Sequence, residues 1–226
     1  LRRKRNHDRR LRAGHLWVYS NEVDNEATPL KAFEPGQTAA VESAQGKWLG
    51  LAYVNPNSLI CARIVTRQRE RALDRGLLVH RIKVALALRE RLYRTPNYRL
   101  LFSEGDALPG VIVDRYGDHL VVQITTAGME RHREALVDAL VEVLRPAGVL
   151  LRNDGAGRAT EGLDRYVELA FGELPEHLLV EEGGCRFLVS PGTGQKTGWF
   201  YDQAPNRQAF RHLVAGRRVL DVCSYV

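Results

Sequence analysis

Residues 190–203 read SPGTGQKTGWFYDQ, with three glycines, a Lys-Thr pair and three consecutive aromatic residues. Such a composition raises the question of phosphate binding. A Walker A loop requires G-x-x-x-x-G-K-[ST], because its backbone N–H groups wrap the phosphates. Here Gln195 stands where the second glycine should precede Lys196, and Ser190 occupies the position of the first. The sequence therefore disfavours a phosphate-binding loop.

The residues that follow this segment indicate another architecture. Residues 204–214 are expected to form a short helix, with Pro205 suited to its first turn. Residues 218–222 are apolar and are expected to form a buried strand, with Asp221 near its carboxyl end. A strand of this kind opens a doubly wound α/β domain, in which nucleotide ligands bind outside the carboxyl ends of the strands.

The first 72 residues are expected to form a compact β-barrel. Four short apolar runs, at residues 16–19, 38–41, 48–54 and 59–65, are separated by turn residues rich in Pro, Gly and Asn. Strands of about five residues with such punctuation are typical of small barrels.

The middle of the chain predicts a small α+β domain preceded by a helix. Apolar residues recur at helical spacing over residues 75–94, and Pro96 ends that segment. Further along, the pattern predicts strands at 100–103, 110–114 and 119–125, a helix at 129–144, a strand at 149–152 and a loop at 153–162. A hairpin is expected at 178–190, around the Gly183-Gly184 turn. The fold class is thus multidomain α+β and α/β, with domains at 1–72, 73–175 and 176–226.

Positive charge is concentrated at the N-terminus. The chain has a net charge of +6, and residues 1–12 hold seven Lys or Arg against one Asp, so the remainder is balanced at 26 basic and 26 acidic groups. A basic cluster can neutralise phosphates and release counterions, which predicts nucleic-acid binding. The alternative is a solvated, disordered arm. Trp17 and Tyr19 share one strand face and could stack on bases, although packing in the barrel core is favoured.

Cysteine and histidine usage indicates neither disulfides nor a metal site. Cys61, Cys185 and Cys223 are odd in number and form no C-x-x-C pair, which favours reduced thiols in a cytoplasmic protein. The seven histidines are scattered. No apolar run approaches the roughly 18 residues that span a bilayer, and the charged N-terminus is unlike a signal peptide. We therefore expect no membrane partner and no metal.

Taken together, these segments resemble one enzyme family. QKTGWFYDQAPNR followed by RRVLDVCSYV is similar to the start of the catalytic domain of S-adenosylmethionine-dependent (SAM-dependent) methyltransferases, above all the large-subunit rRNA cytosine-C5 methyltransferases, in which K-T-G-x-x-x-D-Q precedes motif I. AGHLWVYSNEV and PGQTAAVESAQGKWLGLAYVNPNSLICARI resemble the RNA-binding PUA domain of those enzymes. SEGDALPGVIVDRYGDHLVVQITTAGM resembles their central domain. Residues 176–226 would then begin a Rossmann-like methyltransferase domain.

The resemblance implies a cofactor site for SAM and an RNA surface. Its implied cofactor residues are Lys196, Thr197, Gly198, Phe200, Asp202, Arg207, Asp221, Cys223 and Tyr225. Arg207 would contact the cofactor carboxylate or pair with Asp202. In the structural alternatives, Asp202 caps the following helix, Arg207 is a surface charge and Cys223 is a buried apolar residue. The RNA-binding candidates are Arg2, Arg3, Lys4, Arg5, Arg9, Arg10, Arg12 and Trp17.

The implied activity is formation of 5-methylcytosine in large-subunit rRNA. That reaction needs a cysteine thiolate that adds to C6 of the base. None of the three cysteines matches the family nucleophile, and the chain ends within motif I, so no catalytic residue is assigned and these residues alone are expected to be inactive. Asp202-Gln203 is followed by Ala204-Pro205, where the family commonly has arginine. The alternatives are a non-catalytic RNA-binding module and methylation of another atom, such as guanine N7. A homodimer is left open.

Overall fold

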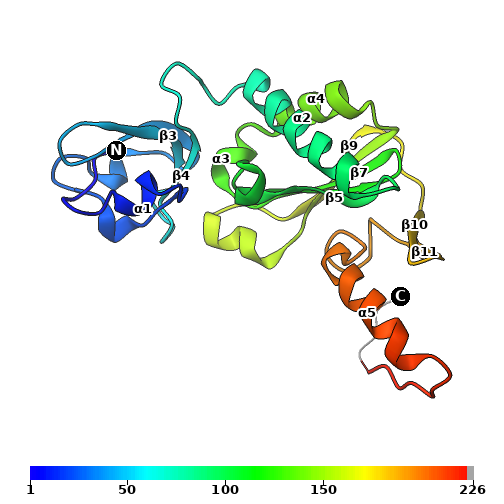
Figure 1. The fold of residues 1–226 in the computed structure, drawn as a ribbon. Coiled ribbons are helices and arrows are strands. Elements are labelled where there is room, and N and C mark those ends of the chain that lie inside the picture. The colour runs from blue at the N-terminus through cyan, green and yellow to red at the C-terminus, as the bar shows by residue number, and fades with distance from the viewer. Residues whose placement is uncertain (223–226) are drawn as a thin grey trace.

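The structure is a computed structural model that describes residues 1–222. Figure 1 shows three successive parts: an N-terminal β-rich part, a central sheet covered by helices, and a hairpin followed by a helix that extends away from the sheet. None of the helices among these residues is sufficiently long and apolar to cross a membrane.

The N-terminal part contains four strands around a core of its own. Its elements are α1 (Arg9–Arg12), β1 (Trp17–Val18), η1 (Ser20–Glu22), η2 (Leu30–Ala32), β2 (Gln37–Glu42), β3 (Trp48–Val54) and β4 (Ala62–Thr66). The strands pair antiparallel in the order β1-β4-β3-β2, with irregular register in both the β2–β3 and β3–β4 pairs. All four predicted strand regions are therefore confirmed.

The central part is a five-stranded sheet with helices. Its elements are α2 (Arg75–Leu92), β5 (Asn97–Phe102), η3 (Ser103–Asp106), β6 (Val111–Tyr116), β7 (His119–Ile124), α3 (Ala127–Glu130), α4 (Arg133–Leu144), β8 (Gly148–Asn153), η4 (Ala156–Glu161) and β9 (Tyr166–Gly172). The strand order is β5-β6-β7-β8-β9, and only β7 and β8 run parallel, joined through α4. The predicted order of three strands, a helix and a strand is confirmed.

The fifth strand, β9, was not predicted. Val167, Leu169 and Phe171 alternate along it as in a strand, although all three side chains are exposed. The segment forms a strand because its backbone pairs with β8 along six residues.

Alternation along the strands gives the central sheet two different faces. On β6, Val111 and Val113 point into the core formed with α2 and α4. Tyr116 points the opposite way and packs in a separate cluster with Val180 and Trp199. Because successive side chains of a strand face opposite sides, the same strands support both layers.

The second face receives the C-terminal part of the chain. This part contains β10 (Leu178–Glu182), β11 (Cys185–Val189), η5 (Tyr201–Gln203) and α5 (Ala204–Val214). Gly183 and Gly184 both have positive φ, as the tight turn of the predicted hairpin requires. The hairpin and the helix at 204–214 are both confirmed.

The expected strand at residues 218–222 is wrong. These residues have no strand structure, and the side chains of Leu220 and Val222 are largely exposed. A buried parallel strand needs neighbours on both sides, and the described residues place none beside this segment. Within residues 176–222 the structure therefore has a hairpin and a helix rather than a Rossmann-like sheet.

The N-terminal and central parts meet in a buried polar joint. Asn55 donates to a carboxylate oxygen of Glu161 at 2.7 Å, and Arg63 donates to the other at 3.0 Å. Tyr53 donates its hydroxyl to the Pro109 carbonyl at 2.7 Å. Since Asn55, Glu161 and Tyr53 are buried, separating the two parts would leave their polar groups unsatisfied.

Gly128 is required where α3 meets this joint. A Cβ placed on Gly128 would lie 2.0 Å from Cγ of Tyr53. We expect Gly128→Ala to lower the free energy of unfolding by about 1–3 kcal/mol through overpacking, although alanine is the better helix former. Gly155→Ala is the control, because nothing lies within 4 Å of its added Cβ. Urea unfolding measures both; equal stability of the two variants would contradict this account of the joint.

Candidate functional site

Residues 190–200, here called the docked loop, lie against the second face of the central sheet. Arg152 of β8 donates to the carbonyl oxygens of Pro191 and, at 3.0 Å, of Gly194. Arg152 is almost fully buried. A buried guanidinium thus satisfies carbonyl groups of a segment that has no regular backbone pairing of its own.

The centre of the docked loop is held by β6. Asp114 is fully buried and accepts two hydrogen bonds of 2.9 Å from Arg99 and one of 2.5 Å from the Thr197 hydroxyl. Tyr116 donates its hydroxyl to the Thr197 carbonyl at 3.0 Å. Burial opposes the charge of Arg99, but its bonds to Asp114 prevail and raise the pKa of Arg99. Arg99 therefore stays positively charged beside the buried Asp114 side chain.

Backbone geometry turns Thr197 inward and its neighbour outward. Lys196 has φ of 50° and Gly198 has φ of 112°. Lys196 is exposed, and its Nζ lies 4.6 Å from the ring centroid of Phe200, a cation–π contact. Thr197 and Gly198 were expected to line or brace a cofactor. Both are buried, on the side of the loop that faces the central sheet.

Arg207 of α5 pairs with Glu182 rather than with Asp202, so the expected pairing is wrong. Its guanidinium donates to the two Glu182 carboxylate oxygens at 2.5 and 2.8 Å. It also donates to the Phe200 carbonyl at 2.9 Å and lies 4.7 Å from the ring centroid of Trp199. The hairpin brings Glu182 to this position, which the local sequence did not reveal. Arg207 thereby fixes α5 to the hairpin and is not a free surface charge.

Asp202 does not cap α5, so that alternative is wrong. The N-cap is Gln203, and it makes no side-chain capping bond. Asp202 is exposed and accepts a 3.3 Å hydrogen bond from the Gln203 side chain. It lines a pocket of about 390 Å³ together with Arg99 and Tyr93.

The remaining cofactor candidates lie near the end of the chain. Asp221 is exposed in an irregular segment, so its expected place at the end of a parallel strand is wrong. Cys223 and Tyr225 lie outside the described residues. Within residues 1–222, no three His, Cys, Asp or Glu side chains are grouped so that they could hold a metal ion.

The basic N-terminus is folded onto the β-rich part and is not a disordered arm. Arg3 is fully buried and pairs with Glu22 at 3.1 Å, so its expected contact with RNA is wrong. Arg10 pairs with the same carboxylate at 2.9 Å. The buried guanidinium of Arg3 needs this carboxylate, because an unpaired buried charge is costly, whereas Arg10 stays partly exposed.

The other cations of this segment remain at the surface. Arg2 pairs with Glu42 at 3.7 Å, Arg12 pairs with Asp8 at 2.9 Å, and Lys4 donates to a backbone carbonyl. Arg5 and Arg9 are exposed and have no ion-pair partner among residues 1–222. They are the cations best placed to meet phosphates.

Trp17 is exposed, so its expected packing in the barrel core is wrong. Val18 takes the core position instead. The Trp17 indole donates to Glu104 of the central domain at 2.7 Å, and its ring meets that of Tyr19 edge-on at 6.5 Å. The two rings therefore lie side by side, as predicted, although Tyr19 follows the strand and is not part of it.

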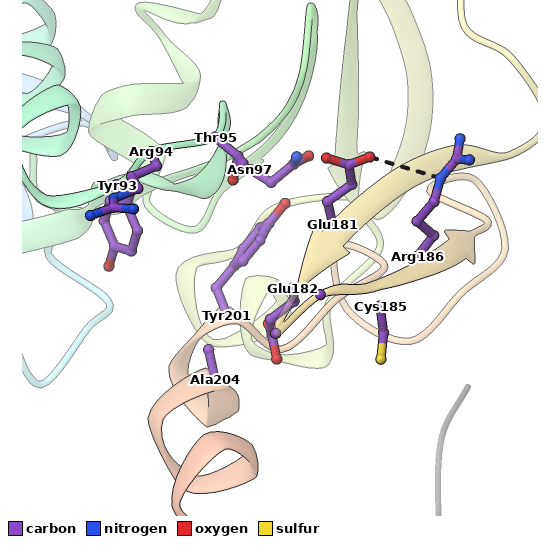
Figure 2. Close-up of a pocket in the computed structure, with 12 residues that line it drawn as sticks. Tyr93, Arg94, Thr95, Asn97, Glu181, Glu182, Cys185, Arg186, Tyr201 and Ala204 are labelled. Atoms are coloured by element: carbon purple, nitrogen blue, oxygen red, sulfur yellow. Dashed lines mark ion pairs between the residues drawn. The ribbon is translucent and has the colours of Figure 1, made fainter. Parts of the chain in front are cut away.

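A larger pocket of about 550 Å³ lies between the start of β5, the β10–β11 turn and the start of α5. Figure 2 shows Asn97 and Glu181 pointing toward each other across it, with Tyr201 between β5 and α5. None of the predicted site residues lines this pocket.

Sequence reasoning missed the residues that hold the docked loop. Asp114 and Arg152 each follow a run of apolar strand residues, VIV before Asp114 and VLL before Arg152, and this is the signal that could have found them. Such a residue is retained in a buried strand only when it is paired or hydrogen-bonded. Its partner cannot be named from sequence alone, since Asp114 and Thr197 are 83 residues apart.

We compared the sequence and the fold with those of known proteins. Residues 2–67 match the family described as PUA-like domain. The whole fold is similar to a solved chain titled "a putative SAM-dependent methyltransferase from Streptococcus mutans", with a TM-score of 0.76 and 21% identity, covering 93% of this chain and 53% of that one. A second solved chain, titled as a methyltransferase complexed with SAH, has the same TM-score and identity and is covered to 52%.

Two curated relatives are similar over nearly all of the chain. "Ribosomal RNA large subunit methyltransferase I" of Erwinia tasmaniensis is 39% identical over 215 residues, which cover 93% of this chain and 54% of the relative. The protein of the same name from Vibrio cholerae is 37% identical over 223 residues, covering 96% and 55%. The chain thus spans about half the length of the curated relatives it matches.

The contact between Glu182 and Arg207 predicts a pH dependence. Burial alone would raise the pKa of Glu182, but hydrogen bonds from Arg207 and Trp199 prevail and lower it below the usual 4.5. Because the folded pKa is the lower one, the stabilisation is complete above the unfolded pKa and is lost as the pH falls through the folded pKa.

We therefore expect α5 to detach from the hairpin once acidification takes the pH below the usual carboxyl pKa of 4.5 and through the lowered pKa of Glu182, and Glu182→Gln to weaken this docking already at neutral pH. The Trp199 indole N–H resonance, followed by NMR from pH 7 to about 3, reports the contact because that N–H donates to Glu182. Glu134→Gln, at an exposed position on α4, serves as the control. An unchanged resonance in Glu182→Gln would contradict the assignment.

Proposed function

We propose that this chain serves a SAM-dependent methyltransferase of large-subunit rRNA, with the PUA-like domain contacting RNA and the docked loop forming one wall of the cofactor site. The observation that carries this proposal is the 39% identity to the Erwinia tasmaniensis protein across 93% of the chain. A fortuitous match would not extend through three structural parts in the same order.

Lys196 on the docked loop and Asp202, two residues after the loop ends, suit the methionine end of SAM. Lys196 is a cation without an acidic partner within the described residues, and Asp202 is an exposed carboxylate. A free amino acid group carries one charge of each sign, so Lys196 can meet its carboxylate and Asp202 its ammonium. When bound, SAM supplies an activated methyl group on a sulfonium. Thr197, Gly198 and Arg207 position the loop from beneath.

The preferred target atom is C5 of cytosine. This reaction requires a thiolate that adds to C6 of the base. Cys61 does not fit that role, because it is buried and burial raises its pKa to about 11. Cys185 is exposed at the hairpin turn and is not among the residues of the docked loop. We therefore assign no nucleophile to residues 1–222. Methylation at guanine N7, which needs no such nucleophile, remains the alternative.

A chimera tests the proposal. Residues 1–222 replace the matching part of the Erwinia tasmaniensis protein, and the chimera is incubated with methyl-labelled SAM and unmodified large-subunit rRNA. We expect label in 5-methylcytidine after digestion and nucleoside mass spectrometry, and none with the present chain alone. Label in 7-methylguanosine would select the alternative target. A folded chimera that incorporates no label, beside an active native relative, would argue for a non-catalytic RNA-binding module.

The exposed cations predict salt-dependent RNA binding. Each phosphate contact contributes about 0.7 to the slope of log affinity against log salt for single strands. We expect the double substitution Arg5→Gln and Arg9→Gln to reduce the slope by about 1.4 in fluorescence anisotropy with single-stranded rRNA fragments. The matched control is Lys83→Gln with Arg145→Gln, two exposed cations on α2 and at the end of α4. An equal slope in both double variants would remove the N-terminal segment from the RNA surface.

A further inference from the structure

The 550 Å³ pocket between β5 and the β10–β11 turn has the features of a ligand site that the proposed cofactor loop does not use. It is formed by three segments that are distant in sequence, and its volume lies within the usual range for small-ligand sites. Its lining includes two aromatic rings, one amide, the carboxylates of Glu181 and Glu182, and two arginines (Figure 2).

An unsatisfied acceptor lies in this pocket. The Oδ1 atom of Asn97 is buried and has no hydrogen-bond partner among the described residues. Buried polar side-chain atoms are seldom left unpaired, so each exception calls for an explanation. Because Asn97 lines the pocket, a ligand carrying an N–H donor would supply the missing bond.

A second acceptor faces the first. Glu181 points toward Asn97 from β10, as Figure 2 shows. Its carboxylate is about half exposed, and among residues 1–222 its one ion pair is a long contact of 3.8 Å with Arg186. Two acceptors on opposite sides of one space suit a group that offers two N–H donors, such as an exocyclic amino group on a flat ring.

The pocket also offers a fixed aromatic platform. The Tyr93 side chain is half exposed and stacks on the buried Tyr98 ring at 5.2 Å and 27°. Arg115 donates to the Tyr98 hydroxyl at 3.1 Å, which holds the lower ring in place. Tyr201 provides a second ring, anchored by its hydroxyl to the Arg115 carbonyl at 2.9 Å. Rings that are already ordered lose little entropy when a base stacks on them.

The pocket is connected to the proposed cofactor loop. Tyr93 and Tyr201 also line the neighbouring pocket of about 390 Å³, and Asp202 lines that pocket as well. Arg94 at the mouth is exposed and has no ion-pair partner within the described residues, so it is available to a phosphate. A nucleotide in the larger pocket would thus belong to a strand that passes beside the docked loop.

From these observations we infer that the pocket holds one unpaired RNA base with an exocyclic amino group, which is adenine, cytosine or guanine and not uracil. The base stacks on Tyr93, its amino group donates to Asn97 and Glu181, and its phosphate meets Arg94. The inference rests on the proposed function, because it takes RNA as the ligand, and it adds a second RNA contact on the central domain.

Fluorescence anisotropy with short labelled oligomers of adenosine, cytidine or uridine tests the inference on the full chain. We expect adenosine and cytidine oligomers to bind about 10-fold tighter than uridine oligomers. Tyr93→Ala should weaken all three oligomers by about 10-fold through lost stacking. Glu181→Gln and Asn97→Ala should reduce the preference for amino bases and leave uridine binding unchanged.

Phe171→Ala is the matched control, since Phe171 is an exposed aromatic residue on the distant strand β9. Tyr93 and Glu181 are also exposed enough to be replaced without unfolding, which circular dichroism verifies. Equal affinity for the three oligomers, unchanged in Tyr93→Ala, would overturn the inference. If the Arg5 and Arg9 substitutions still lower the salt slope, the proposed function stands without it. A folded chain that binds no RNA at low salt would overturn both.

Discussion

The arrangement of the C-terminal part depends on one buried carboxylate. Asp114 has no access to solvent, so its charge must be met by the protein, and Arg99 and Thr197 meet it. Without the docked loop, Asp114 would lose its hydrogen bond from the Thr197 hydroxyl. The Tyr116 and Arg152 side chains would lose the loop carbonyl groups to which they donate. Each buried polar group left unsatisfied costs about 1–3 kcal/mol, and more where the group is charged. Polar desolvation therefore holds the loop in place, in addition to the apolar packing of Trp199.

This constraint explains why neighbouring residues of the loop have different roles. Thr197 can reach Asp114 only if the backbone turns sharply on both sides, which the positive φ angles of Lys196 and Gly198 accomplish. The same turns leave Lys196 and Asp202 facing outward. A segment that is anchored on both sides of an exposed Lys196 is suited to bind a charged small molecule, because the group that would contact the ligand is already positioned before binding.

The sequence alone predicted most secondary-structure elements, which arise from local patterns, but not the contacts between residues that are distant in the sequence. Hairpin turns, apolar alternation and helix periodicity predicted most strands and helices correctly, because these patterns arise from neighbours within a few residues. Arg3 and Arg207 were misjudged, because their partners Glu22 and Glu182 are chosen by tertiary folding. The apolar segment at residues 218–222 has a strand composition, but composition alone does not provide the neighbouring strands that a buried parallel strand requires.

The central sheet connects the two ends of the molecule through contacts of the same physical kind. At one end, Asn55 and Glu161 fasten the PUA-like domain through buried hydrogen bonds. At the other, Asp114 and Thr197 fasten the docked loop. Buried polar contacts are directional, unlike apolar packing, so each joint fixes orientation as well as proximity. If the PUA-like domain holds RNA as proposed, the central domain fixes how far that RNA lies from the docked loop.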